Sequence, residues 1–101
     1  MKIYISGPMT GRPDFNYPEF KRIEGLLLAA GHDVESPHRN DPPPCGTWEG
    51  WMRLAITQLM RCDAVAFLND WHVSKGAAIE ISLAQDLEMP IKGWREWLRE
   101  S

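Results

Sequence analysis

The segment from Asp63 to Leu68 constrains the fold most strongly, because it is an almost unbroken apolar run in a chain of 101 residues. Such a run is typical of a parallel strand that is buried on both faces. Parallel strands are joined by crossover connections, which are usually helices. The run therefore predicts an α/β fold in which helices cover both faces of a sheet.

The rest of the chain alternates between strand and helix patterns. We expect further strands at 2–6, 33–36 and 90–92, and helices at 16–30, 48–61, 74–88 and 94–98. This order predicts a small three-layer parallel-sheet domain of the Rossmann or flavodoxin-like type over residues 1–101.

Caps and periodicity give details of these helices. We expect Asn16 to cap the first helix, with Phe20, Ile23 and Leu27 facing the core. In the helix that begins near Ser74, the apolar spacing predicts that Ile79, Leu83 and Leu87 face inward. The segment 37–46 contains three consecutive prolines, which predict a semi-rigid loop.

A ligand site is expected at the carboxyl ends of the strands, where open α/β sheets bind their ligands. Three loops should meet there: the loop after the first strand, the segment 37–46 and the segment 69–76. The first of these contains Gly7, Pro8, Met9, Thr10 and Gly11. Trp71 and Trp51 could stack on a base, although packing in the core or at an interface is the simpler explanation for Trp51.

Glu80 is the best catalytic candidate in this region. It lies about two turns into the helix that begins near Ser74, where the helix dipole favours an ionised carboxylate. The small residue Gly76 allows the start of this helix to approach a ligand closely, and its free amides can hold an anion. A solvated helical glutamate explains the same spacing, and Ser74 is equally consistent with a simple helix cap.

Two segments resemble a known family. Residues 3–11 (IYISGPMTG) are similar to the first loop of the DUF4406 family, and residues 62–68, followed by Trp71, Ser74, Gly76 and Glu80, resemble its second half. DUF4406 in turn resembles the nucleoside 2-deoxyribosyltransferases and the 2′-deoxynucleoside 5′-phosphate N-hydrolases. The resemblance covers nearly the whole chain.

The resemblance implies a function for several of these residues. Glu80 would attack the anomeric carbon of a nucleoside or nucleotide and release the base, Tyr4 would orient it, and Ser74 would contact a phosphate. Tyr4 is equally consistent with a core aromatic. The implied substrate-binding residues are Gly7, Pro8, Met9, Thr10, Gly11, Trp71, Ser74 and Gly76. No cofactor and no metal is implied.

The chain also departs from the hydrolase pattern. Ala55 occupies the position at which the N-hydrolases carry an aspartate, and Pro8 and Thr10 replace a serine and an arginine of their first loop. Catalysis is therefore one hypothesis. A non-catalytic nucleotide-binding module and a small oligomeric interaction protein are the two alternatives.

Composition bears on partners and location. The net charge of −3 and the lack of a basic stripe argue against a nucleic-acid polymer as partner. His32, His38 and His72 have no metal-ligand spacing. No apolar stretch suits a membrane, and two cysteines without a paired motif favour a cytoplasmic location. Five tryptophans are more than a small core is expected to enclose, so we expect a homo-oligomer, most simply a dimer.

Overall fold

The computed structural model describes residues 1–99, and its centre is a four-stranded parallel sheet in the order β2–β1–β3–β4. The strands are β1 (Lys2–Ser6), β2 (Asp33–Glu35), β3 (Ala64–Phe67) and β4 (Ile91–Gly93). Ser6 pairs with Phe67, so β1 and β3 end at the same level. The predicted parallel sheet is confirmed, with small shifts at the strand ends.

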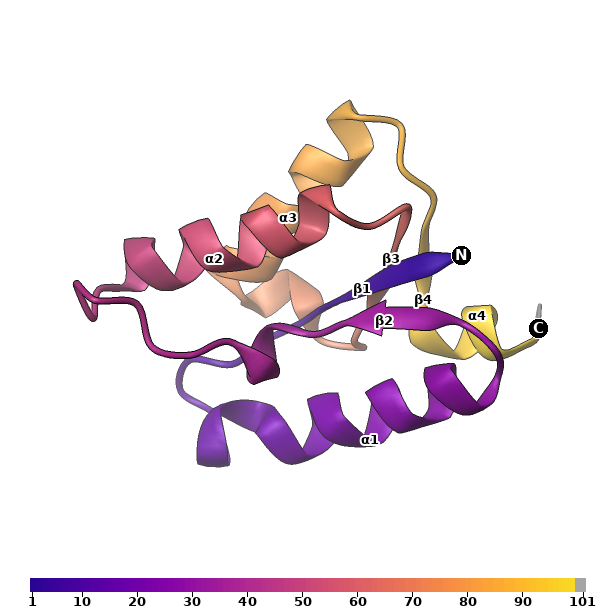
Figure 1. Cartoon of the computed structure of the whole chain (residues 1–101), viewed down its shortest axis with the longest axis horizontal. Coiled ribbons are helices and arrows are strands. Elements are labelled where there is room, and N and C mark those ends of the chain that lie inside the picture. The colour runs from indigo at the N-terminus through magenta and orange to yellow at the C-terminus, as the bar shows by residue number, and fades with distance from the viewer. Residues whose placement is uncertain (100–101) are drawn as a thin grey trace.

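Helices cover both faces of this sheet (Figure 1). One face carries α1 (Tyr17–Ala29) and α4 (Trp94–Arg99), and the other carries α2 (Trp48–Met60) and α3 (Lys75–Asp86). The predicted three-layer α/β domain is therefore confirmed. Within residues 1–99, no helix is long and apolar enough to cross a lipid bilayer.

The alternation of side chains along β1 divides the core into two clusters. Ile3 and Ile5 face α1 and α4, whereas Tyr4 faces α2 and α3. All three side chains have no exposed surface. On the face that carries Tyr4, the side chain of Glu80 on α3 meets the sheet.

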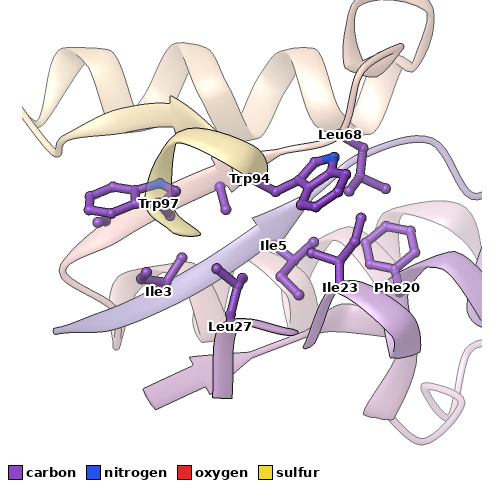
Figure 2. Close-up of a cluster of buried hydrophobic side chains, with 10 residues drawn as sticks. Ile3, Ile5, Phe20, Ile23, Leu27, Leu68, Trp94 and Trp97 are labelled. Carbon is purple, nitrogen blue, oxygen red and sulfur yellow. The ribbon is translucent and has the colours of Figure 1, made fainter. Parts of the chain in front are cut away.

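The cluster beneath α1 and α4 contains two of the five tryptophans (Figure 2). Trp94 and Trp97 are 7% and 4% exposed and pack with residues of β1 and α1. The indole N–H of Trp97 donates to the carbonyl of Val65 at 2.9 Å. The core therefore encloses two of the five tryptophans, Trp94 and Trp97. The other three tryptophans are half-buried.

The start of α1 differs from the predicted cap. Asn16 has a left-handed backbone (φ 63°), as do the two residues before it, and its side chain makes no cap hydrogen bond. Its amide donates instead to the carbonyl of Pro8 at 2.9 Å, which ties the loop after β1 to the start of the helix. Short 3₁₀ turns also occupy Pro13–Asn16, Pro37–Arg39 and Trp71–Val73, where we expected irregular loop.

The buried face of α3 also differs from the prediction. Ile79 and Leu87 are exposed and Leu83 is half-buried. The residues that face the sheet are Ala77, Glu80, Ile81 and Ala84. Two of these four are alanines, so the helix can lie close to the sheet, and the buried carboxylate of Glu80 finds hydroxyl donors there. Apolar periodicity could not reveal this face because it counts a glutamate as outward-facing.

Candidate active site

The carboxylate of Glu80 is buried, and each of its oxygens accepts a hydrogen bond. The residue is 4% exposed. The hydroxyl of Tyr4 donates to its Oε2 atom at 2.5 Å, and the hydroxyl of Ser6 donates to its Oε1 atom at 2.8 Å. Tyr4 and Ser6 are two residues apart on β1 and therefore point to the same face of the sheet. We did not predict Ser6, although its spacing from Tyr4 is the signal that identifies it.

Burial and hydrogen bonding act in opposite directions on this carboxyl group. Burial raises the pKa of Glu80 more than the hydrogen bonds from Tyr4 and Ser6 lower it, and the resulting pKa is about 7. Burial raises the pKa of Tyr4 well above its usual value, and the neighbouring Glu80 adds to this shift. Tyr4 therefore keeps its proton at neutral pH, and its hydroxyl donates a hydrogen bond that favours the ionised form of Glu80.

Glu80 lies in the wall of a cavity of about 670 Å³, within the usual range for small-molecule sites. The cavity lies beyond the carboxyl ends of β1 and β3, where the strand order of the sheet reverses. Four parts of the chain contribute to its wall: Gly7, Pro8, Met9, Thr10, Arg12, Phe15 and Tyr17 after β1; Pro37 and Asn40 after β2; Trp48, Glu49, Trp51, Met52 and Ala55 on α2; and Val73, Ser74, Lys75, Gly76, Ala77 and Glu80 around the start of α3.

Most of the predicted site residues lie together in this cavity. Its wall includes Gly7, Pro8, Met9, Thr10, Ser74, Gly76 and Glu80. Tyr4 lies behind the wall and contacts it through its hydrogen bond to Glu80. Trp71 and Gly11 lie outside the wall. Trp71 packs edge-on against Phe67 with ring centroids 6.0 Å apart, and Gly11 is exposed in a left-handed turn (φ 80°).

Close backbone approaches give the cavity its shape. A Cβ atom on Gly7 would lie 2.5 Å from the side chain of Leu68, so only glycine allows the end of β1 to pass the end of β3 at this distance. A Cβ atom on Gly76 would lie 3.0 Å from the sulfur of Met52, so the start of α3 is close to α2. Ser74 caps α3 by accepting the N–H of Ala77 at 3.2 Å, and it also lines the cavity.

Both cations that line the cavity are engaged with neighbours. Arg12 forms an ion pair with Asp70 at 2.7 Å, which joins the loop after β1 to the loop after β3. The ammonium group of Lys75 lies 4.5 Å from the ring centre of Trp48.

The wall of the cavity is otherwise rich in aromatic rings. Trp48 and Trp51 come from α2, and Tyr17 comes from the start of α1. Of these rings, the sequence suggested only Trp51 as a stacking surface. Trp48 lies on the same helix as Trp51, whereas Tyr17 comes from a segment that meets α2 only in the folded chain.

Ala55 faces both the cavity and the core. It is 6% exposed, lines the cavity, and packs in the same cluster as Tyr4 and Leu59. The only carboxylates in the described wall of the cavity are those of Glu49 and Glu80. Within residues 1–99, no group of three or more His, Cys, Asp or Glu side chains could hold a metal ion.

Comparisons with known proteins give a family and two structural neighbours. A family described as "Domain of unknown function (DUF4406)" matches residues 1–93. The solved structure of a 2-deoxyribosyltransferase from Bacillus psychrosaccharolyticus matches with a TM-score of 0.71 and 23% identity, over 90% of this chain and 69% of that one. A conserved protein from Enterococcus faecalis V583 matches with a TM-score of 0.63 and 22% identity, over 90% of this chain and 60% of that one.

At these identities the two structures establish the fold of the chain. No curated protein matches it in sequence.

Proposed function

The chain belongs to the DUF4406 family, and we propose that it cleaves the N-glycosidic bond of a nucleoside or nucleotide, or transfers its sugar to another base, with Glu80 as the nucleophile. The observation that carries this proposal is the Glu80 carboxylate, which two hydroxyl groups hold against the wall of a cavity of about 670 Å³. A helical glutamate with a purely structural role would face water or pair with a cation.

The proposed reaction has two steps. In the first, a carboxylate oxygen of Glu80 bonds to the anomeric carbon while the carbon–nitrogen bond breaks, and the base leaves with the electron pair and takes up a proton from water. In the second, water or another base attacks the anomeric carbon and gives up its proton to solvent, and the carboxylate of Glu80 leaves. Dividing one difficult displacement into two easier ones is the general advantage of a covalent intermediate.

The wall of the cavity suits such a substrate. Its aromatic rings offer flat apolar faces on which a base can stack. The structural likeness to a 2-deoxyribosyltransferase supports a small nucleoside as ligand. Because Arg12 and Lys75 are already engaged with Asp70 and Trp48, neither is a preformed phosphate clamp. The amides at the start of α3, near Ser74, are the best remaining anion site.

A second function is favoured by one observation. Ala55 lines the cavity where the N-hydrolases would place an acid, so the protein lacks that group for protonating the leaving base. The second candidate is therefore a non-catalytic nucleotide-binding module with the same cavity.

The test is a chromatographic assay of base release from 2′-deoxynucleosides and their 5′-phosphates, with and without a second free base. We expect release by the wild type and a loss of at least about 10³-fold in Glu80→Gln, because the amide keeps the shape and removes the attacking charge. Glu24→Gln is a matched control, because Glu24 is also 4% exposed and neither it nor its partner Arg39 lines the cavity. Equal rates in the wild type and Glu80→Gln would contradict the proposal. Thermal stabilisation by these ligands without base release would support the binding module instead.

A further inference from the structure

A chain of side-chain hydrogen bonds leads from the edge of the sheet to the cavity. It begins at the carboxylate of Glu35 on β2. Lys2 and Arg61 pair with its carboxylate at 3.0 and 3.2 Å. The hydrogen bond from Arg61 is the main cause that lowers the pKa of Glu35 to about 2. Burial opposes this shift, and Lys2 adds to it. Glu35 is therefore ionised at neutral pH and can only accept hydrogen bonds.

The next residue in the chain is Gln58 on α2, which is 5% exposed. Its Nε2 amino group donates to Glu35 at 3.3 Å and to the carbonyl of Ser36 at 3.2 Å. Both partners are pure acceptors, so only one orientation of the Gln58 amide is compatible with them. The Oε1 atom of Gln58 must therefore face the opposite way, towards Asn40.

Asn40 completes the chain and lines the cavity. Its Nδ2 amino group donates to Oε1 of Gln58 at 2.9 Å. In the part of the protein spanning residues 1–99, no hydrogen bond ends on Oδ1 of Asn40, and no buried polar side-chain atom lacks a partner. Oδ1 is therefore an accessible acceptor whose direction is set by two residues outside the cavity.

We propose that Asn40 determines specificity, by presenting a fixed hydrogen-bond acceptor that selects bases with an exocyclic amino group over bases with a carbonyl group at the same place. An amide that is free to rotate could offer either its oxygen or its amino group and would not discriminate. Here, half a turn of the Asn40 amide would place its Oδ1 against Oε1 of Gln58. Half a turn of the Gln58 amide would place its amino group against that of Asn40. Gln58 and Glu35 are the positioning residues of this acceptor.

This inference rests on the proposed function for the type of ligand, but it is tested by binding, without turnover. The probes are two matched pairs: 2′-deoxyadenosine with 2′-deoxyinosine, and 2′-deoxycytidine with 2′-deoxyuridine. Their affinities are measured by titration calorimetry on Glu80→Gln protein. We expect the amino member of at least one pair to bind about tenfold more tightly, the scale of one neutral hydrogen bond.

Two variants in the Glu80→Gln background identify the origin of this preference. Asn40→Ala removes the acceptor, so the preference should fall to within about twofold. Gln58→Leu removes the amide that fixes Asn40, so the preference should also fall, although position 58 lies outside the wall of the cavity. Asn69→Ala, an exposed change outside the same wall, should leave the preference intact. Melting temperatures separate misfolding of the Gln58→Leu variant from loss of selectivity, and Asn40→Ala alone is sufficient for the test if that variant fails to fold.

The outcomes separate this inference from the proposed function. Equal affinity within each pair, a preference that survives Asn40→Ala, or no binding of any probe at millimolar concentration would each overturn the role of Asn40. A preference that depends on Asn40 in a protein whose wild type releases no base would uphold the inference and contradict the proposed function. Base release by the wild type without any preference within the pairs would uphold the proposed function and contradict the role of Asn40.

Discussion

At the residue scale, Glu80 is a carboxyl group that the fold buries but still equips for ionisation. The protein interior disfavours its charge, and the hydroxyls of Tyr4 and Ser6 favour it. The result is a pKa of about 7, where a carboxyl group exists in both forms under neutral conditions. Such a balance is typical of functional carboxyl groups.

The raised pKa predicts how Glu80 affects stability. Its value in the folded protein exceeds the ordinary 4.5, so the stability that this group contributes is complete below about pH 4.5 and is lost as pH rises through about 7. Glu80→Gln does not ionise and should avoid this loss. We expect the variant to gain up to roughly 3 kcal/mol over the wild type between pH 5 and pH 9. Thermal unfolding of both proteins at the two pH values checks this, and a difference that does not change with pH would contradict it.

The same pKa predicts the pH dependence of activity. A nucleophilic carboxylate must be ionised, so kcat/KM for base release should fall about tenfold for each pH unit below about 7 and should level off above it. Initial rates between pH 5 and pH 8.5 on a nucleoside without a phosphate provide the measurement. A profile that stays flat down to pH 5 would mean that Glu80 is ionised throughout or that it does not attack the sugar.

At the element scale, short segments bring the site together through close contacts at strand and helix ends. Gly7 lets the end of β1 pass Leu68, and Gly76 lets the start of α3 approach α2. The loops after β1 and β3 are further joined by the ion pair of Arg12 and Asp70. The cavity is therefore a property of several elements, and none of them forms it alone.

Replacing Gly7 tests the tightest of these contacts. In Gly7→Ala the new methyl group would lie 2.5 Å from the buried Leu68, so one of them must move. We expect a loss of about 1–3 kcal/mol in the free energy of unfolding, measured by urea denaturation. Gly25→Ala is the matched control, since its Cβ atom meets nothing within 4 Å on α1. That change should stabilise the protein by roughly 0.5–1 kcal/mol. Equal effects of the two changes would contradict the close approach.

Replacing Ala55 tests the face of α2 that lines the cavity. Ala55→Asp places a carboxylate at the position that the resemblance matches with the aspartate of the N-hydrolases, and we expect base release to rise at least about tenfold if that match is right. The side chain can reach the cavity, so the melting temperature should fall less than in Leu59→Asp, where the residue is fully buried. An equal fall in melting temperature, with no gain in rate, would mean that position 55 faces the core.

How far the sequence predicts these elements depends on what each signal records. The apolar run at β3 predicts a buried parallel strand, and the strand order then predicts where the loops meet. The position of Glu80 near the start of its helix makes it a candidate nucleophile, whereas Tyr4 could be given a role only through the family resemblance. The inward face of α3 could not be predicted, because hydroxyl groups on β1 compensate its glutamate. Ser6 is identified only by its spacing from Tyr4, and Asn40 and Gln58 have no signal, since their roles depend on hydrogen bonds between distant segments.

At the scale of the whole molecule, the core encloses some of the large apolar side chains and leaves others at the surface. Trp94 and Trp97 complete the core on the side of α1. On the opposite side, Ile79 on α3 is 38% exposed and Leu87, directly after α3, is 52% exposed. This surface is where we expect a second copy of the chain to pack.

Light scattering coupled to gel filtration tests this expectation. We predict a homodimer at high micromolar concentration, and a shift to monomer in Leu87→Glu, because a charge in an apolar contact is not compensated. Glu88→Gln, an exposed neighbour, should leave the mass unchanged. A wild-type protein that is monomeric under these conditions would refute the prediction.

The central claim, that Glu80 attacks the sugar, is tested most directly by the mass of the intact protein after incubation with a 2′-deoxy-2′-fluoronucleoside. Fluorine next to the anomeric carbon slows both steps by opposing positive charge on the sugar, and a good leaving base lets the first step outrun the second. We predict that the wild type gains the mass of one fluorosugar without its base, that fragmentation places this mass on Glu80, and that Glu80→Gln gains nothing. A sugar attached to another residue, or base release by the wild type with no adduct, would contradict the claim.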